Sequence, residues 1–135
     1  MNASECNAVG WSLSFAWAIE NEQWENFPSV ELDSAMACFS FCAEKGFWPA
    51  ENNALILILL GLVPDADQNE ALEKLIKLAL SSRDWRLLEN VACCYRRGLG
   101  TKIIPDLYLK FLKLSSEVKR SQKSTELKVA RLESC

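Results

Sequence analysis

The chain has 135 residues, of which 50% are apolar and 24% are charged, and its formal net charge is −3. These values exclude a disordered chain, which has fewer apolar residues and more net charge, and they predict a single domain over residues 1–135. The sequence contains no histidine, which excludes Ser-His-Asp and Cys-His catalysis and every zinc site that uses imidazole.

Neither a membrane span nor a secretory signal is expected. The longest apolar run, residues 54–63, is too short to cross a bilayer and is typical of a buried helix. The first residues contain an acid, Glu5, and no base before an aromatic-rich stretch, unlike a signal peptide. We therefore expect a cytoplasmic protein that does not bind membranes.

The first half of the chain predicts two helices that follow each other closely. Asp33 or Ser34 is expected to cap a helix that runs to about Lys45 and ends at Gly46. The apolar residues 54–60 are expected to form the centre of the next helix.

The second half predicts helices with clearer start and stop signals. Asp67 and Glu70 have the spacing of a capping box and begin a helix over about 70–80. A helix over 85–97 ends at Gly98, and Pro105 begins a helix that runs to about Val118. A last short helix is expected within the tail, residues 119–135, from Leu127, Ala130 and Arg131 at helical spacing. No segment alternates like a strand, so the predicted fold class is all-α.

An internal repeat relates three parts of the chain. The second copy follows the first at an offset of 36 residues and the third at 37, through the aligned pairs Pro28/Pro64, Glu31/Asp67, Ala35/Ala71, Ala43/Ala79, Gly61/Gly98 and Ala79/Ser116. A period of this length made of two helices predicts a short α-solenoid with repeats at 10–45, 46–81 and 82–118. The small residues Ala43, Ala79 and Ser116 are expected to allow close helix packing. A six-helix bundle without true repeats is the alternative.

Residues 91–100, VACCYRRGLG, resemble the signature of Sel-one-like repeats, which are relatives of the tetratricopeptide repeat. That signature has a Tyr, a Gly three residues later and a second Gly after two more, followed by an acid and alanines that Asp67, Ala71 and Ala79 match. The complete Gly-x-Gly turn is present only in the third repeat. The resemblance covers roughly residues 10–118. It implies a solenoid that binds proteins, without catalysis, cofactor or metal ion.

Charge is divided unequally between the two halves of the chain. Residues 1–70 hold eleven acids and one base, a net charge of −10, whereas residues 71–135 hold seven acids and fourteen bases, a net charge of +7. Acids steer a basic partner, and aromatic anchors ringed by charge are typical of interface hot spots. The candidate partner-binding residues are therefore Glu20, Glu22, Trp24, Glu25, Phe27, Trp48 and Glu51.

These features favour a dedicated inhibitor, such as a bacterial immunity protein that neutralises a toxin with a basic surface, for example a nuclease. The alternative is an adaptor or secretion chaperone that holds a peptide in a concave groove. A homodimer is also expected, because Trp11, Phe15 and Trp17 crowd an end of the solenoid that has no polar capping repeat.

Two other classes of function are disfavoured. Arg96 and Arg97 can lower the pKa of the Cys93 or Cys94 thiol, and a four-thiolate site with Cys38 and Cys42 is conceivable. However, buried cysteines of a reducing cytosol explain these residues more simply, with the terminal Cys135 exposed. We therefore expect no enzyme.

The basic C-terminal helices can attract phosphates, but the acidic half opposes this and no nucleic-acid motif is present. We therefore expect no nucleic-acid binding.

Overall fold

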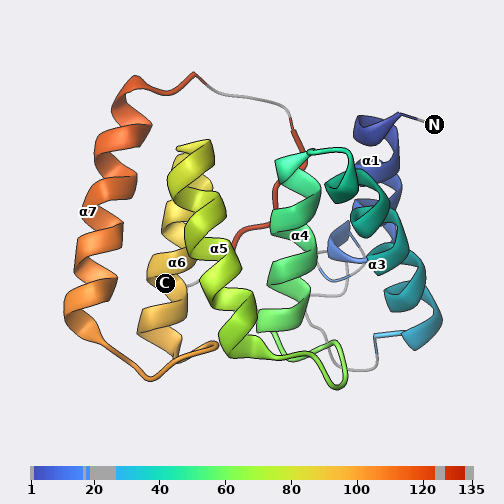
Figure 1. Cartoon of the computed structure of the whole chain (residues 1–135), viewed down its shortest axis with the longest axis horizontal. Coiled ribbons are helices and arrows are strands. Elements are labelled where there is room, and N and C mark those ends of the chain that lie inside the picture. Colours follow the sequence, from blue (N-terminus) through green and yellow to red (C-terminus); the bar gives the residue numbers. More distant parts are fainter. Residues whose placement is uncertain (1, 17, 19–26, 124–126, 133–135) are drawn as a thin grey trace. The chain divides into compact units, whose positions relative to one another are not determined.

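The structure is a computed structural model that describes residues 2–16, 18, 27–123 and 127–132. The elements among these residues are all α-helices (Figure 1), namely α1 (Ala3–Leu13), α3 (Ser29–Glu44), α4 (Trp48–Leu59), α5 (Gln68–Ser82), α6 (Trp85–Arg97) and α7 (Pro105–Ser121). The prediction of an all-α fold is confirmed. None of these helices is long and apolar enough to span a bilayer.

The described residues group into two compact units. Unit 1 comprises those within 1–54 together with 127–130, and unit 2 comprises those within 55–126 together with 131–135. The solenoid of three repeats stays a prediction.

In unit 1, α1 packs against α3 through a glycine. Asn2 begins α1 with a capping box, because its side chain accepts a hydrogen bond from the Glu5 amide at 2.8 Å while the Glu5 carboxylate bonds the Asn2 amide. A Cβ atom placed on Gly10 would lie 2.7 Å from the ring of Phe39, which is fully buried. Glycine at this position therefore sets how closely α1 approaches α3.

Helix α3 begins earlier than predicted. It starts at Ser29 directly after Pro28, and no side chain caps it. Its buried residues Leu32, Ala35, Phe39 and Cys42 follow helical spacing, and burying Leu32 draws the helix past the predicted cap at Asp33. The predicted end is confirmed, since Lys45 is the C-cap and Gly46 has a φ of +80°.

In unit 2, α5 packs against α6 and α6 against α7, and successive helices run antiparallel (Figure 1). Asp67 caps α5 by accepting a hydrogen bond from the Glu70 amide at 3.1 Å. Helix α6 has the predicted bounds and ends at Gly98, whose φ is +73°. Pro105 begins α7 as predicted, and this helix continues three residues beyond Val118, to Ser121.

The second glycine of the Gly98-Leu99-Gly100 turn is needed for two reasons. Its φ is +73°, and a Cβ atom there would lie 2.6 Å from the carbonyl oxygen of Gln68 and 2.9 Å from Cδ2 of Leu59. The first of these distances involves backbone, which cannot move aside cheaply. Because Gly100 has no side chain, the turn before α7 packs directly against Leu59 of α4 and Gln68 of α5.

Two predictions about helix packing and one about the tail are corrected. Ala79 is buried as expected, but Ser116 is exposed and Ala43 is only half-buried. The buried small residue of α7 is Ser115, whose hydroxyl donates to the carbonyl oxygen of Trp85 at 2.8 Å. The expected last helix is not found, because residues 127–132 are non-helical.

Candidate interaction site

Most of the predicted partner-binding residues lie outside the described part of the chain, namely Glu20, Glu22, Trp24 and Glu25. Phe27 precedes α3, and Trp48 and Glu51 lie in the first turn of α4; all three are half-buried. The Phe27 and Trp48 side chains are therefore partly packed against the rest of the protein. The seven residues stay a prediction as a set.

A different surface of unit 1 exposes large apolar side chains. Val30 is 72% exposed and Phe41 is 43% exposed, both on α3. Ser34 and Ala37 are also exposed and lie between them at three- and four-residue spacing, so the four share one side of the helix. We call Val30, Ser34, Ala37 and Phe41 the outer α3 face.

Charged residues flank the outer α3 face. Asp33 and Glu44 are exposed, and the Lys45 ammonium lies 4.8 Å from the centre of the Phe41 ring. Two exposed apolar side chains on one side of a helix, flanked by carboxylates, make the outer α3 face a candidate interaction surface. Val30 and Phe41 are out of phase with the buried residues of α3, and that is the sequence signal that distinguishes them from core residues.

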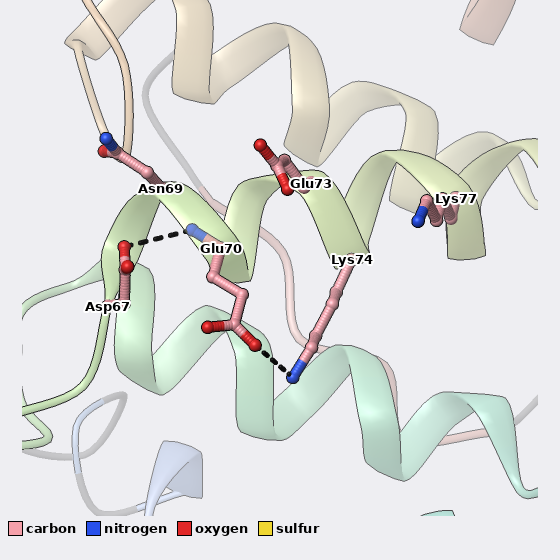
Figure 2. Close-up of a pocket in the computed structure, with 6 residues that line it drawn as sticks. All are labelled: Asp67, Asn69, Glu70, Glu73, Lys74 and Lys77. Atoms are coloured by element: carbon pink, nitrogen blue, oxygen red, sulfur yellow. Dashed lines mark hydrogen bonds and ion pairs between the residues drawn. The ribbon is translucent and has the colours of Figure 1, made fainter.

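A shallow hollow on α5 is explained by local helix chemistry (Figure 2). Its lining residues, which are all exposed, are Asp67, Asn69, Glu70, Glu73, Lys74 and Lys77. Glu70 forms an ion pair with Lys74 at 3.0 Å, and Asp67 caps the helix. An exposed i,i+4 pair contributes about 0.3–0.5 kcal/mol. The hollow therefore needs no ligand to account for its residues.

Three asparagines of unit 1 form a buried polar cluster that sequence reasoning missed. Asn52 and Asn53 are fully buried and Asn7 is 2% exposed. The Asn53 amide nitrogen donates to the carbonyl oxygen of Lys128 at 2.9 Å, and its carbonyl oxygen accepts from the Ala130 amide at 2.7 Å. The side chain of Asn53 thus hydrogen-bonds the tail as a neighbouring strand would.

The other two asparagines complete the cluster. Asn7 donates to the same Lys128 carbonyl oxygen at 3.1 Å, and Asn52 donates to the carbonyl oxygen of Ala130 at 3.1 Å. The amide of Asn53 also donates to the Asn7 carbonyl oxygen at 3.0 Å. We call Asn7, Asn52 and Asn53 the asparagine cluster. These four bonds to residues 127–130 of the tail all go to main-chain atoms.

In unit 2 the next residues of the tail are held differently. The Leu132 amide donates to Asn90 Oδ1 at 2.8 Å, and Asn90 is 1% exposed. The Arg131 guanidinium pairs with Glu89 and lies 4.7 Å from the Trp85 ring. This part of the tail is therefore fixed by charge and stacking as well as by an amide.

Buried polar residues also fix the start of α6. Asp84 is 3% exposed, and its carboxylate accepts hydrogen bonds from the Arg86 guanidinium at 2.9 Å and the Gln122 amide at 2.7 Å. Burial opposes ionisation, but these hydrogen bonds outweigh it and lower the pKa of the Asp84 carboxyl. Asp84 is therefore a structural anion that ties α6 to the end of α7.

Two of the described cysteines, Cys42 and Cys94, are poor nucleophiles. Burial raises the pKa of the Cys42 and Cys94 thiols to about 12, the first with a further contribution from Cys6 and the second against the opposing charge of Arg97. The expectation that Cys94 is a buried structural residue is confirmed, and the disfavoured possibility that the arginines lower its pKa is wrong. Cys93 is buried as expected, but it is disulfide-bonded, so the expectation of a reduced thiol is wrong for it.

The predictions about metal binding and self-association rest on residues of which only some belong to the described part of the chain. Among the described residues, no group of three or more Cys, Asp or Glu side chains is arranged to hold a metal ion. Cys135 and Trp17 lie outside those residues. Phe15 is buried and its ring lies 5.1 Å from that of Trp11. The homodimer stays a prediction.

Comparison of the chain with protein-family models, curated proteins and solved structures found no match. The resemblance to Sel-one-like repeats therefore stays a prediction.

Proposed function

We propose that the chain is a protein-binding module that uses the outer α3 face to bind a protein with a basic surface. The observation that carries this proposal is the exposure of Val30 and Phe41 within the acidic half of the chain. Burying such side chains in an interface removes apolar area from water at about 25 cal/mol per Å². The flanking carboxylates of Asp33 and Glu44 speed encounter with a positively charged partner.

The most specific form of this function is a dedicated inhibitor that acts in the cytoplasm, such as an immunity protein that neutralises a toxin. A toxin that binds nucleic acid carries the basic surface that the acidic half requires. The inhibitor function predicts one folded partner, bound stoichiometrically, whose enzymatic activity falls when this chain is added.

The experiment compares two double variants of the tagged full chain. Val30→Ser with Phe41→Ser removes the apolar part of the outer α3 face. Ile103→Ser with Leu109→Ser is the matched control in unit 2, because these side chains are 64% and 59% exposed. Each protein is used to capture partners from its native source, and the affinity of any stoichiometric partner is then measured.

We expect the α3 variant to lose affinity roughly tenfold or more, because two apolar anchors are removed, while the control retains it. The partner's activity is then assayed with and without the wild-type chain. Equal affinity of both variants would exclude the outer α3 face as the binding surface. A partner whose activity is unchanged would exclude the inhibitor function.

A further inference from the structure

The asparagine cluster binds the tail through the tail's backbone. Asn53 donates to one carbonyl group and accepts from the amide two residues later, at 2.9 and 2.7 Å. The single side-chain amide of Asn53 thereby bonds two backbone groups of the tail, the Lys128 carbonyl and the Ala130 amide. Peptides that add a strand to a protein are bound by the same exchange of main-chain hydrogen bonds.

These buried amides require an occupant. An amide group taken from water without a hydrogen-bond partner is destabilising, and apolar side chains would fill a core without that cost. Asn52 and Asn53 are fully buried, yet their bonds include ones to residues from the far end of the chain. The cluster is therefore built to receive a backbone, rather than to fill a core.

The side chains of the bound segment define the chemistry of the occupant. Ala130 is fully buried and Val129 is 7% exposed, whereas Lys128 is exposed with its ammonium 5.9 Å from the centre of the Trp11 ring. The fitting segment is extended, has a basic residue first, an aliphatic residue second and a small residue third. The main-chain bonds themselves do not depend on which side chains are present.

We propose that Asn7, Asn52 and Asn53 form a binding site for an extended peptide of a partner protein, and that the chain's own residues 127–130 occupy this site as a competing ligand in cis. A partner segment with the pattern Lys-Val-Ala binds when it displaces the tail. The tail lowers the apparent affinity for such a peptide by the fraction of molecules in which the site is free. This proposal is independent of the outer α3 face.

The test uses the full chain and a labelled synthetic peptide with the sequence of residues 125–133, TELKVARLE. Ala130→Asp in the chain places a carboxylate at a fully buried position, so it expels the tail in cis and leaves the asparagines unchanged. Lys128→Gln is the matched control, because this side chain is exposed. Helix content and cooperative thermal unfolding establish that each variant is folded.

We expect the peptide to bind the Ala130→Asp chain at least about tenfold more tightly than the wild-type or Lys128→Gln chain. Adding Asn53→Leu to the Ala130→Asp chain abolishes that gain. Equal peptide affinity for the Ala130→Asp and wild-type chains would overturn the proposal, as would a gain that survives the loss of Asn53.

A second measurement does not depend on that variant folding. Peptide N-methylated at the alanine lacks the N–H that bonds Asn53, and peptide N-methylated at the valine is its control. Wild-type chain is mixed with each peptide, and hydrogen exchange of the chain's own Ala130 amide is followed. We expect exchange to accelerate with the unmodified and valine-methylated peptides but not with the alanine-methylated one. Unchanged exchange with all three at saturating concentration would refute displacement.

Discussion

Units 1 and 2 hold adjacent parts of the same tail by different chemistry. In unit 1, Lys128 and Ala130 are held by uncharged, buried amides. In unit 2, Arg131 is held by a partly exposed carboxylate and an indole ring, and only Leu132 is bonded by a buried amide. The unit 1 bonds therefore involve no charged side chain, whereas the Arg131–Glu89 pair of unit 2 is partly exposed and is screened by salt. Substitutions in each unit test that difference.

Asn53→Leu in unit 1 is expected to destabilise the protein by about 3 kcal/mol. The substitution removes the bond from the buried Ala130 amide and the bond that the Asn7 carbonyl oxygen accepts, and each lost bond to a buried polar group costs about 1–3 kcal/mol. Chemical denaturation measures the change. Asn69→Leu on the exposed side of α5 is the control and should shift stability by less than about 0.5 kcal/mol. A loss below about 1 kcal/mol for Asn53→Leu would contradict this account.

Alanine substitutions of Gly46 and Gly100 compare the stability cost of an added Cβ atom in the two units at similar φ values. Gly46 in unit 1 and Gly100 in unit 2 have φ values of +80° and +73°, but only Gly100 has neighbours closer than 3 Å to an added Cβ atom. Gly46→Ala is expected to cost about 1 kcal/mol for its backbone angle. Gly100→Ala adds an overpacking cost, for a total of about 2–3 kcal/mol. Thermal unfolding measures both, and equal losses would show that the contacts of Gly100 relax freely.

Acid is expected to destabilise the protein through Asp84 in unit 2. Its folded pKa is lower than its unfolded value of about 3.9, so its contribution is complete above that value and disappears as pH falls through the folded pKa. Denaturation at pH 5 and near pH 2.5 should show a smaller drop for Asp84→Asn than for the wild type. An identical pH dependence would exclude Asp84 as a source of acid lability.

Arg131→Ala is expected to have the smallest effect, about 1 kcal/mol. The pair with Glu89 is partly exposed, and the stacking on Trp85 adds a similar modest amount. Because salt screens exposed charges, part of this difference should vanish between about 0.05 and 0.5 M sodium chloride. The Asn53→Leu loss should stay constant over the same range. If both losses varied equally with salt, the chemical contrast between the units would be wrong.

The helices of unit 2 were predictable from local signals. Helix α6 has its capping aspartate and its terminal glycine adjacent in sequence to its ends, and Pro105 marks the start of α7. In unit 1, the start of α3 depends on burying Leu32 against other elements, which overrides the polar cap signal at Asp33. Local patterns thus define helices whose ends are fixed by local bonds.

The tail was mispredicted because its conformation is set by residues far away in sequence. Leu127, Ala130 and Arg131 have helical spacing, but Asn53 and Asn90 take up the tail amides that a helix would have used. Nothing near an isolated asparagine indicates that it bonds a distant backbone. The two asparagines are 37 residues apart, the offset assigned to the third repeat, and that spacing was the one available sequence clue.

The bond between Asn53 and Lys128 spans 75 residues, and this has a consequence during protein synthesis. A ribosome adding about 5–20 residues per second needs roughly 4–15 s to reach Lys128 after it has added Asn53. For that interval the nascent chain contains the asparagines but not the segment that satisfies them. Translation therefore opens a time window in which another extended segment, from a chaperone or a partner, meets no competition from the tail.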